Sequence, residues 1–334
     1  MKNLPLFQLM LLPALALLIS CNTTVRSDES PFPLYGEYLG QTPPGDTAVL
    51  FAPGIVNIGT QTRDMAITPD GKEIFFCMSV PRYSTIMTMR LEEGGWTSPE
   101  VLVNMTDPAY YNFEPALSSD GNTLFFLSNR PDTANGETAP DQDIWIMERT
   151  ETGWGVPVNL GSPINTSDEE YYPSLTNDGT LYFTRAKAGD PVNRIYRSRL
   201  VEGRYSEPEL LPENVNCGTN RFNAWVDREE RFLIVPAVGM PDTYGGTDYY
   251  ISFRDENDNW SAPVNMGRQI NSIAEREFSA SVSPDGKYLF FMSQRDMSQP
   301  EKLSYKVMTD TYFGAGNGFP AIYWIDASFI DRLR

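Results

Sequence analysis

Short runs of apolar residues recur along this chain, each directly behind a compact polar turn. The best copy is SASVSPDGKYLFFMSQR, Ser279–Arg295, and related stretches are Ile67–Ser79 and Leu117–Arg130. Alternate residues of a strand face opposite sides, and all four residues of Leu289–Met292 are apolar. The pattern therefore predicts β-strands in sheets that are covered on both faces.

Three sequence markers recur in constant order, and each repeat unit spans roughly 50 to 58 residues. The turn marker occurs at Asp70-Gly71, Asp120-Gly121, Asp178-Gly179, the degenerate Glu229-Glu230, and Asp285-Gly286. An aromatic-x-x-Pro marker occurs at Trp96, Trp154, Tyr205 and Trp260. Branched or aromatic runs ending near a charge occur at Thr85–Arg90, Asp143–Arg149, Arg194–Arg199, Asp248–Arg254 and Ala321–Ala327. Each unit thus predicts four short antiparallel strands joined by tight turns.

Repeated four-stranded sheets that cover one another favour an all-β fold, the β-propeller. Five second strands and five third strands can be counted, but only four aromatic-x-x-Pro strands follow them. Ala48–Asn57 has the pattern of the missing fourth strand. We predict five four-stranded antiparallel blades, with six as the alternative, in a ring closed by this N-terminal strand, which leaves no exposed sheet edge.

The core Ser283-Pro284-Asp285-Gly286, with a following Leu-Phe-Phe run and a later [DR]-I-[WY], resembles the TolB-type, WD-like propeller repeat. The resemblance covers about Thr47 to Arg334. It implies a β-propeller domain over residues 47–334. The likeness is to the repeat family and carries no role from TolB itself.

The first residues differ in kind from the rest of the chain. After Lys2, residues 4–20 carry no charge, which predicts a signal peptide over residues 1–20. Leu18-Ile19-Ser20-Cys21 resembles the bacterial lipobox, which implies a lipid-anchored Cys21 and a linker over residues 21–46. An Asp directly after the lipidated Cys would resemble an inner-membrane retention signal, but residue 22 is Asn. We therefore expect an outer-membrane lipoprotein, periplasmic or surface-exposed.

Charge and composition exclude several classes of function. The formal net charge is −18 and the chain has no His, so nucleic acid is not an expected partner and imidazole-based triads and metal sites are excluded. We expect no cofactor and no metal. Of the remaining cysteines, we expect Cys77 to be buried and Cys217 to be exposed, without a disulfide between them.

The connections between blades are rich in aromatic and charged residues and lead into the strands that line the channel. We predict that they form a binding surface for an envelope protein, a peptide or a glycan. The candidate residues are Tyr110, Tyr111, Glu114, Glu170, Tyr171, Tyr172, Arg221, Arg276 and Glu277. Phe113, Phe222 and Phe278 could instead simply pack between blades.

A chain without His and without a nucleophile motif favours a non-catalytic, membrane-tethered binding module, and we expect no enzyme activity. The alternative is a glycan-active hydrolase, because five-bladed propellers of the furanosidase type place three carboxylates on their first strands. The corresponding positions here are Asp64, Glu114, Tyr172, Phe222 and Ser279. Only Asp64 and Glu114 are acidic. Glu170 and Glu277 lie two residues before the corresponding first-strand positions, Tyr172 and Ser279.

Overall fold

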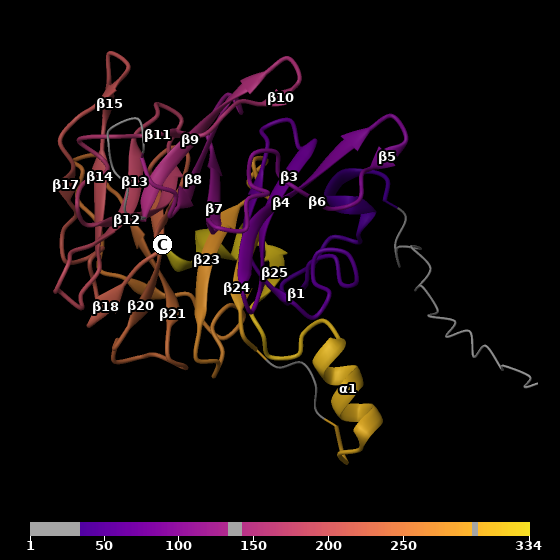
Figure 1. Ribbon diagram of the computed structural model, residues 1–334. Coiled ribbons are helices and arrows are strands. Elements are labelled where there is room, and N and C mark those ends of the chain that lie inside the picture. The colour runs from indigo at the N-terminus through magenta and orange to yellow at the C-terminus, as the bar shows by residue number, and fades with distance from the viewer. Residues whose placement is uncertain (1–33, 133–141, 296–299) are drawn as a thin grey trace, which may run out of the picture.

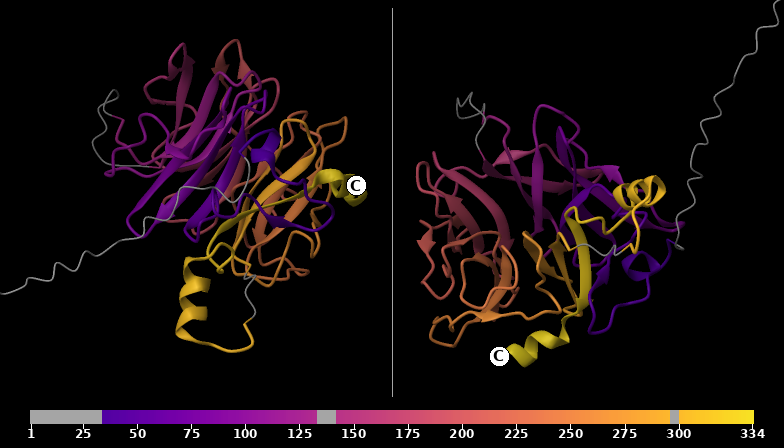
Figure 2. Two further views of the ribbon diagram at one scale, coloured as in Figure 1. Left: turned by 90° about the vertical axis from the view of Figure 1, so that its right-hand side faces the viewer. Right: turned by 90° about the horizontal axis from the view of Figure 1, so that it is seen from below.

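The computed structural model describes residues 34–132, 142–295 and 300–334. Five small antiparallel sheets are arranged around one axis, so the protein is a five-bladed β-propeller (Figures 1 and 2). This confirms the predicted fold class and excludes the alternative of six blades. The expected signal peptide and Cys21 lie outside the described residues.

The first three blades follow the chain in order, and each begins with the strand next to the channel. Blade 1 contains β2 (Gln61–Ile67), β3 (Glu73–Val80), β4 (Tyr83–Glu92), β5 (Gly95–Trp96) and β6 (Glu100–Val101). Blade 2 contains β7 (Asn112–Leu117), β8 (Thr123–Ser128), β9 (Asp143–Thr150), β10 (Gly153–Trp154) and β11 (Val158–Asn159). Blade 3 contains β12 (Glu169–Leu175), β13 (Leu181–Ala186), β14 (Arg194–Ser198), the hairpin β15 (Leu200–Val201) and β16 (Arg204–Tyr205), and β17 (Glu209–Leu210).

The last two blades complete the ring, and the final blade combines both ends of the described chain. Blade 4 contains β18 (Asn220–Arg221), β19 (Trp225–Val226), β20 (Phe232–Val238), β21 (Asp248–Phe253) and β22 (Val264–Asn265). Blade 5 contains β23 (Glu277–Val282), β24 (Tyr288–Ser293), β25 (Ala321–Asp326) and, as its outer strand, β1 (Val49–Leu50). Between β24 and β25 lies helix α1 (Tyr305–Phe313), and the chain ends in the 3₁₀ helix η3 (Ala327–Leu333).

A hydrophobic cluster fills each of the five interfaces between neighbouring sheets. Between blades 1 and 2, for example, Phe75 and Cys77 pack against Phe126 and Trp145. The remaining interfaces have their own clusters, including the one between blades 5 and 1. Burial on both faces of each sheet is what the doubly apolar strand pattern predicted.

The N-terminal strand closes the ring, as predicted. β1 pairs with β25 antiparallel, with Val49 opposite Trp324 and Leu50 opposite Tyr323. Just after it, the buried Asn57 donates from Nδ2 to the carbonyl of Ile322 and accepts from the Ile322 N–H, at 3.0 Å each. Asn57 therefore ties the first part of the chain to its last strand.

The chain before β1 is also packed. The Trp96 side chain donates from Nε1 to the carbonyl of Gly36 at 2.7 Å, and Leu39 in η1 (Glu37–Gly40) is fully buried. Tyr38 lies against Tyr288 and donates to Asp285 Oδ1 at 3.0 Å. The part of the expected linker from Leu34 to Asp46 is thus docked on blades 1 and 5, and only residues before Leu34 are left as a candidate spacer.

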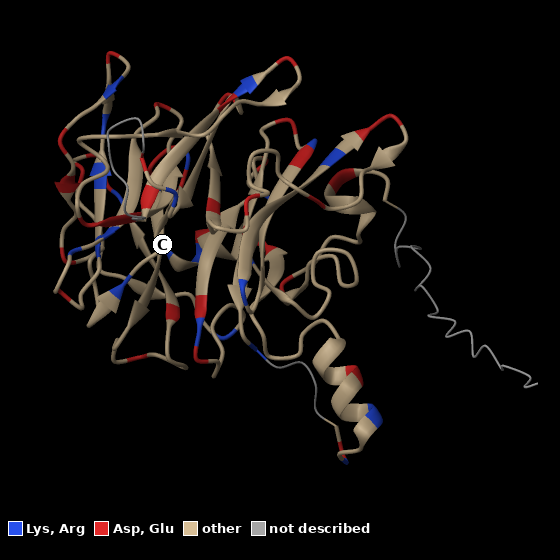
Figure 3. Cartoon of the chain, viewed as in Figure 1, with Lys and Arg blue, Asp and Glu red and all other residues tan. Residues whose placement is uncertain are grey.

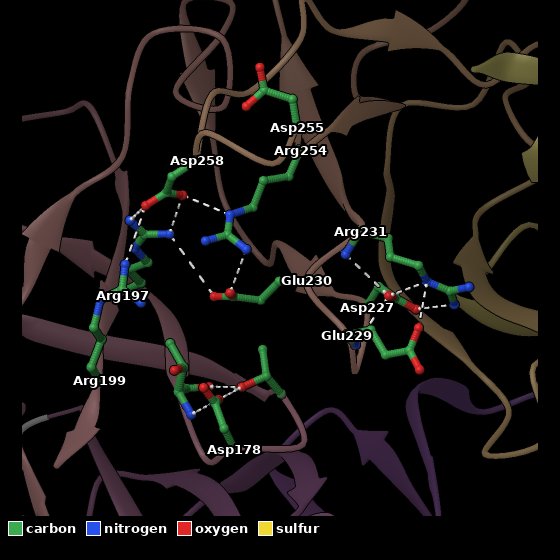
Figure 4. A network of polar contacts seen from close by, with 12 residues as sticks. Asp178, Arg197, Arg199, Asp227, Glu229, Glu230, Arg231, Arg254, Asp255 and Asp258 are labelled. Carbon is green, nitrogen blue, oxygen red and sulfur yellow. Dashed lines mark hydrogen bonds and ion pairs between the residues drawn. The ribbon is translucent and has the colours of Figure 1, made fainter.

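Charged residues occur on all five blades, and one charged network joins blades 3 and 4 (Figures 3 and 4). The buried Arg197 donates from Nη1 to Asp258 Oδ1 at 2.9 Å and from Nη2 to Asp258 Oδ2 at 2.5 Å. Arg254 binds Asp258 at 2.7 Å and Glu230 at 2.9 Å. The Arg197 hydrogen bonds hold the pKa of Asp258 well below its ordinary range.

Both described cysteines are buried and free, so the expectation of an exposed Cys217 is wrong. Cys217 packs with Ala237 and Tyr250, because the loop before β18 folds inward onto the blade. Within the described part of the chain, no helix has the length and hydrophobicity needed to span a membrane.

Candidate functional site

The five strands that line the channel share one distortion. The pairing of β2, β7, β12 and β23 with the next strand shifts register in mid-strand, and β18 and β19 are separated at the same place. One residue at each break has a positive φ: Asp64, Glu114, Tyr172, Asn223 and Ser279, at 59°, 61°, 55°, 51° and 65°. For a residue with a Cβ this conformation costs about 1 kcal/mol, and such strain often marks functional positions. We call these residues the channel ring.

The channel ring turns its side chains toward one another. Glu114 Oε2 accepts from the Tyr172 backbone N–H at 2.7 Å, and Glu114 Oε1 lies 3.3 Å from Asn223 Nδ2. The same amide nitrogen lies 3.3 Å from Ser279 Oγ, and all five residues are buried. Side chains from blades 2, 4 and 5 therefore meet on the axis.

The ring position in blade 4 corrects the sequence alignment by one residue. Phe222 was expected there, but the residue with positive φ is Asn223. The first strand of this blade is reduced to two short pieces around the break, and no fixed spacing in the sequence locates the bulge. Asn223 brings an amide to the ring, so the ring has two acids and no third carboxylate.

One guanidinium joins the two acids. Arg63 Nε lies 2.5 Å from Asp64 Oδ2, and Arg63 Nη2 lies 2.5 Å from Glu114 Oε1. The Arg63 guanidinium also lies over the rings of Phe113 and Phe278, at 4.8 and 5.1 Å from their centroids. Burial lowers the pKa of Arg63, but the carboxylates of Asp64 and Glu114 more than reverse this and raise it. Arg63 is therefore a permanent cation between the two acids.

The residues just before the ring form a second layer, which we call the collar: Arg63, Phe113, Tyr171, Phe222 and Phe278. Four are aromatic, and Phe222 and Phe278 contact edge to face at 5.7 Å. All five line a cavity of about 510 Å³, the collar cavity, on the side of the long loops. The Phe residues thus do more than pack between blades.

A second cavity of about 800 Å³ lies on the side of the short Pro-Asp-Gly turns, and we call it the turn cavity. Asp64 and Tyr172 line it, together with charged turn residues such as Arg228 and Glu229. Glu114 lines both cavities. The channel ring is therefore the partition between two hollows, and Glu114 is accessible from each.

The two acids differ in their surroundings. Burial raises the pKa of Glu114 to about 7. The Arg63 guanidinium opposes this shift, and the neighbouring Asp64 carboxylate adds to it. Arg63 holds Asp64 through Oδ2, and the buried Cys77 thiol is a further hydrogen-bonding neighbour of Asp64. Among the described residues, no group donates to its buried Oδ1. A buried carboxylate oxygen normally has a hydrogen-bond donor, and Oδ1 is a buried acceptor without one, on a residue that lines the turn cavity.

The other predicted site residues fall into two groups. Tyr111, Tyr171 and the exposed Arg276 line the collar cavity with Glu114. Tyr172 belongs to the ring and donates its hydroxyl hydrogen bond to the carbonyl of Ala280 at 2.9 Å. Tyr110 is half-buried beside Arg130, 5.9 Å from its guanidinium, and is not among the residues lining either cavity.

The three remaining candidates bind neighbouring side chains or backbone and line neither cavity: Glu170, Glu277 and Arg221. Glu170 pairs with Arg185 at 2.6 Å, and Glu277 pairs with Arg295 at 3.3 Å; both carboxylates accept from the loop before their strand. Arg221 donates to the carbonyls of Cys217 and Gly218 in its own loop. Neither glutamate supplies the displaced third carboxylate that the hydrolase alternative allowed.

Sequence reasoning missed Arg63, although a signal was present. The residue before the ring position is aromatic in four blades, and Arg63 replaces the aromatic residue in the fifth. Within the described residues no cluster of three or more potential metal ligands is found.

Comparisons with known proteins concern the fold. No protein-family profile and no curated protein matches the sequence. Similar solved structures include TolB from Acinetobacter baumannii, at 14% identity and a TM-score of 0.45 over 80% of this chain and 57% of that one. They also include a thermostable family-43 glycoside hydrolase, at 12% identity and a TM-score of 0.49 over 81% of this chain and 90% of that one. The catalytic domain of the Coprinopsis cinerea GH62 α-L-arabinofuranosidase matches at 9% identity and a TM-score of 0.47 over 79% of this chain and 90% of that one.

This chain spans little more than half the length of the TolB chain. Enzymes predominate among the similar structures, most of them five-bladed glycoside hydrolases. The expectations of a non-catalytic binding module and of no enzyme activity are therefore wrong. The channel ring brings Asp64 and Glu114 together on the Arg63 guanidinium, an arrangement that the sequence analysis did not foresee. At these identities the likeness extends to the fold alone, so the chemistry rests on the residues of the channel.

Proposed function

We propose that this protein is a glycan-active hydrolase that works with the two acids of the channel ring. The observation that carries the proposal is the unequal pair on Arg63: Glu114 has a pKa near neutrality, and Asp64 has a carboxylate oxygen with no donor among the described residues. Glycoside hydrolysis needs one carboxyl group that gives a proton and one that stays ionised.

Glu114 is suited to be the proton donor. A pKa of about 7 leaves a large fraction of the carboxyl protonated near neutral pH, and such a group can protonate the departing glycosidic oxygen. Glu114 and Asp64 both line the turn cavity, so a glycan bound there meets both acids. The walls of this cavity also include the aromatic residues Tyr172, Trp225 and Phe253. Aromatic walls with a few polar groups are typical of small-molecule sites.

Asp64 lines the turn cavity and is suited to act on a water molecule that enters there. Its Oδ2 is fixed by Arg63 Nε, so Oδ1 has a defined position and no competing donor among the described residues. A carboxylate oxygen in this situation can accept a proton from water as the water attacks. Arg63 then has two tasks, since it orients Asp64 and neutralises one of the two acids.

The test is a screen of the purified wild-type protein for turnover of aryl glycosides and oligosaccharides, with furanosides and pyranosides in parallel. Asp64→Asn should lower any turnover by about 10³-fold, because an amide cannot accept the proton. Glu256→Gln, an exposed acid in the turn after β21 that lines neither cavity, is the matched control and should keep wild-type rates. Absence of turnover on every glycan class would refute the proposal.

We also propose that the repeats belong to the TolB-type, WD-like group, on the basis of Ser283-Pro284-Asp285-Gly286 and its relatives. In addition, we propose that Cys21 carries a lipid that tethers the protein to the outer membrane, based on Leu18-Ile19-Ser20-Cys21. Radiolabelled palmitate should label the wild type and not Cys21→Ala. Equal labelling of the two would exclude the anchor.

A further inference from the structure

Helix α1 presents an apolar surface to solvent. None of its residues is buried, and the side chains of Tyr305 and Phe313 are 86% and 64% exposed. The exposed apolar residues of this region form what we call the α1 patch: Leu303, Tyr305, Met308, Tyr312, Phe313 and Phe319. Tyr312 contacts both Phe313 and Phe319 with its ring, and Tyr305, Met308 and Tyr312 follow one another at helical spacing and so share one face of α1. Continuous apolar patches of this kind mark interaction sites.

The patch is held in a defined place. Ser304 caps the helix by accepting from the Val307 N–H at 3.1 Å. At its other end, Asn317 donates to the carbonyl of Gly59 at 3.1 Å, directly before the first strand of blade 1. A Cβ on Gly59 would lie 2.8 Å from the Phe313 carbonyl oxygen, so the helix end and blade 1 are in close contact. The helix therefore projects from the ring as a fixed element (Figure 1).

The α1 patch is electrically neutral in a strongly acidic protein. Lys306 and Asp310 pair with each other on the helix, and Glu301 and Lys302 precede it with opposite charges. The whole chain carries a formal charge of −18, whereas α1 has only this one acid and one base (Figure 3). A neutral surface with Tyr, Met and Phe can approach a lipid bilayer without electrostatic repulsion, and Tyr favours the interface.

The beginning of the described chain lies on the same side of the molecule. The Trp96 N–H donates to the carbonyl of Leu34 at 2.8 Å, which fixes Leu34 beside β5 on blade 1. Figure 1 shows β5 and α1 on the same flank of the ring, with β5 toward the upper end of the strands and α1 below their lower end. Cys21 precedes Leu34 by 13 residues, and a chain of this length reaches at most about 45 Å.

We propose that the α1 patch inserts into the headgroup region of the bilayer that holds the lipid on Cys21, as a second membrane contact. This inference rests on the anchor proposed above. The lipid limits the distance of the protein from the membrane, and the α1 patch fixes its orientation. The collar cavity opens on the side of the long loops, to which α1 belongs, and so faces the membrane, whereas the turn cavity that both acids line faces away from it.

The experiment places a nitroxide on the full chain bound to phosphatidylcholine vesicles. Met308→Cys carries the label in the α1 patch, and Val156→Cys, 72% exposed on blade 2, is the matched control. Cys77 and Cys217 are buried and should not react. Collision with oxygen, which concentrates in lipid, is compared with collision with a water-soluble nickel chelate.

The label at position 308 should collide at least threefold more with oxygen than with the chelate, and the label at 156 should show the reverse. Equal, water-like accessibility at both positions would overturn the proposal. Spin–spin broadening at 308 would also overturn it, since a second copy would then cover the patch. Loss of palmitate labelling is a separate readout, so failure of the anchor can be told apart from failure of the contact.

Discussion

Arg63 Nη2 lies 2.5 Å from Glu114 Oε1, although the two residues come from the first strands of different blades. The contact exists because the bulges in β2 and β7 turn both side chains toward the axis. It places a cation between two buried acids.

Removing the cation should destabilise the fold. Arg63→Met leaves the buried Asp64 and Glu114 without their shared partner, which should cost about 3 kcal/mol of unfolding free energy near neutral pH. Arg276→Met removes an exposed arginine of the same cavity and should change stability by less than about 0.5 kcal/mol. Urea denaturation measures both, and equal stability of the two variants would contradict the structural role of Arg63.

The stability contributed by Glu114 should depend on pH. The pKa of Glu114 in the folded protein is about 7, above the ordinary value of 4.5. The folded state therefore binds the proton more tightly than the unfolded state, and the resulting stabilisation is fully present below about pH 4.5 and is lost as the pH rises through 7. The unfolding free energy of the wild type relative to Glu114→Gln should therefore fall between pH 5 and pH 8, on the order of 2 kcal/mol. A difference that stays constant over this range would rule out the raised pKa.

The charged network between blades 3 and 4 should respond in the opposite direction. The pKa of Asp258 is lowered by its hydrogen bonds to Arg197, so its contribution is present above the ordinary pKa of Asp and is lost as the pH falls through the folded value. Asp258→Ala should cost about 2 kcal/mol at neutral pH, because Arg197 is buried and loses a partner. Thermal unfolding at pH 7 and pH 3 tests this, and a larger loss at pH 3 would be inconsistent with it.

Asn57 should be essential for ring closure. It makes both backbone hydrogen bonds to Ile322 and also accepts from Thr62 at 2.5 Å. Asn57→Ala leaves these buried groups unpaired, at a cost of about 3 kcal/mol. The control is Asn257→Ala, an exposed residue in the turn after β21. Calorimetry should give a lower melting temperature for Asn57→Ala alone.

The sequence predicted the blades and their closure because strand burial repeats with each unit. It also contained a marker that was not recognised: Asn57, Asn165, Asn216 and Asn271 each follow Ile or Val and bind both backbone groups of one third-strand residue. Asn57 alone would have supported the N-terminal closure.

The site was less predictable than the fold. Spacing located Asp64 and Glu114, but the bulge that moves the ring position from Phe222 to Asn223 leaves no periodic signal. The pairing of both acids with Arg63 depends on the curvature of the whole ring, which brings residues 51 positions apart into contact. Burial of Glu170 and Glu277 with arginines of neighbouring strands is likewise a tertiary property.

The most direct test of the central claim is the initial rate of glycoside hydrolysis by the wild type and by Glu114→Gln, measured side by side on the best substrate of the glycan screen. Gln keeps the shape of the side chain but cannot give a proton to the leaving oxygen. The account predicts clear turnover by the wild type and a loss of about 10³-fold in Glu114→Gln, with an unchanged circular-dichroism spectrum. Equal rates for the two proteins would contradict it.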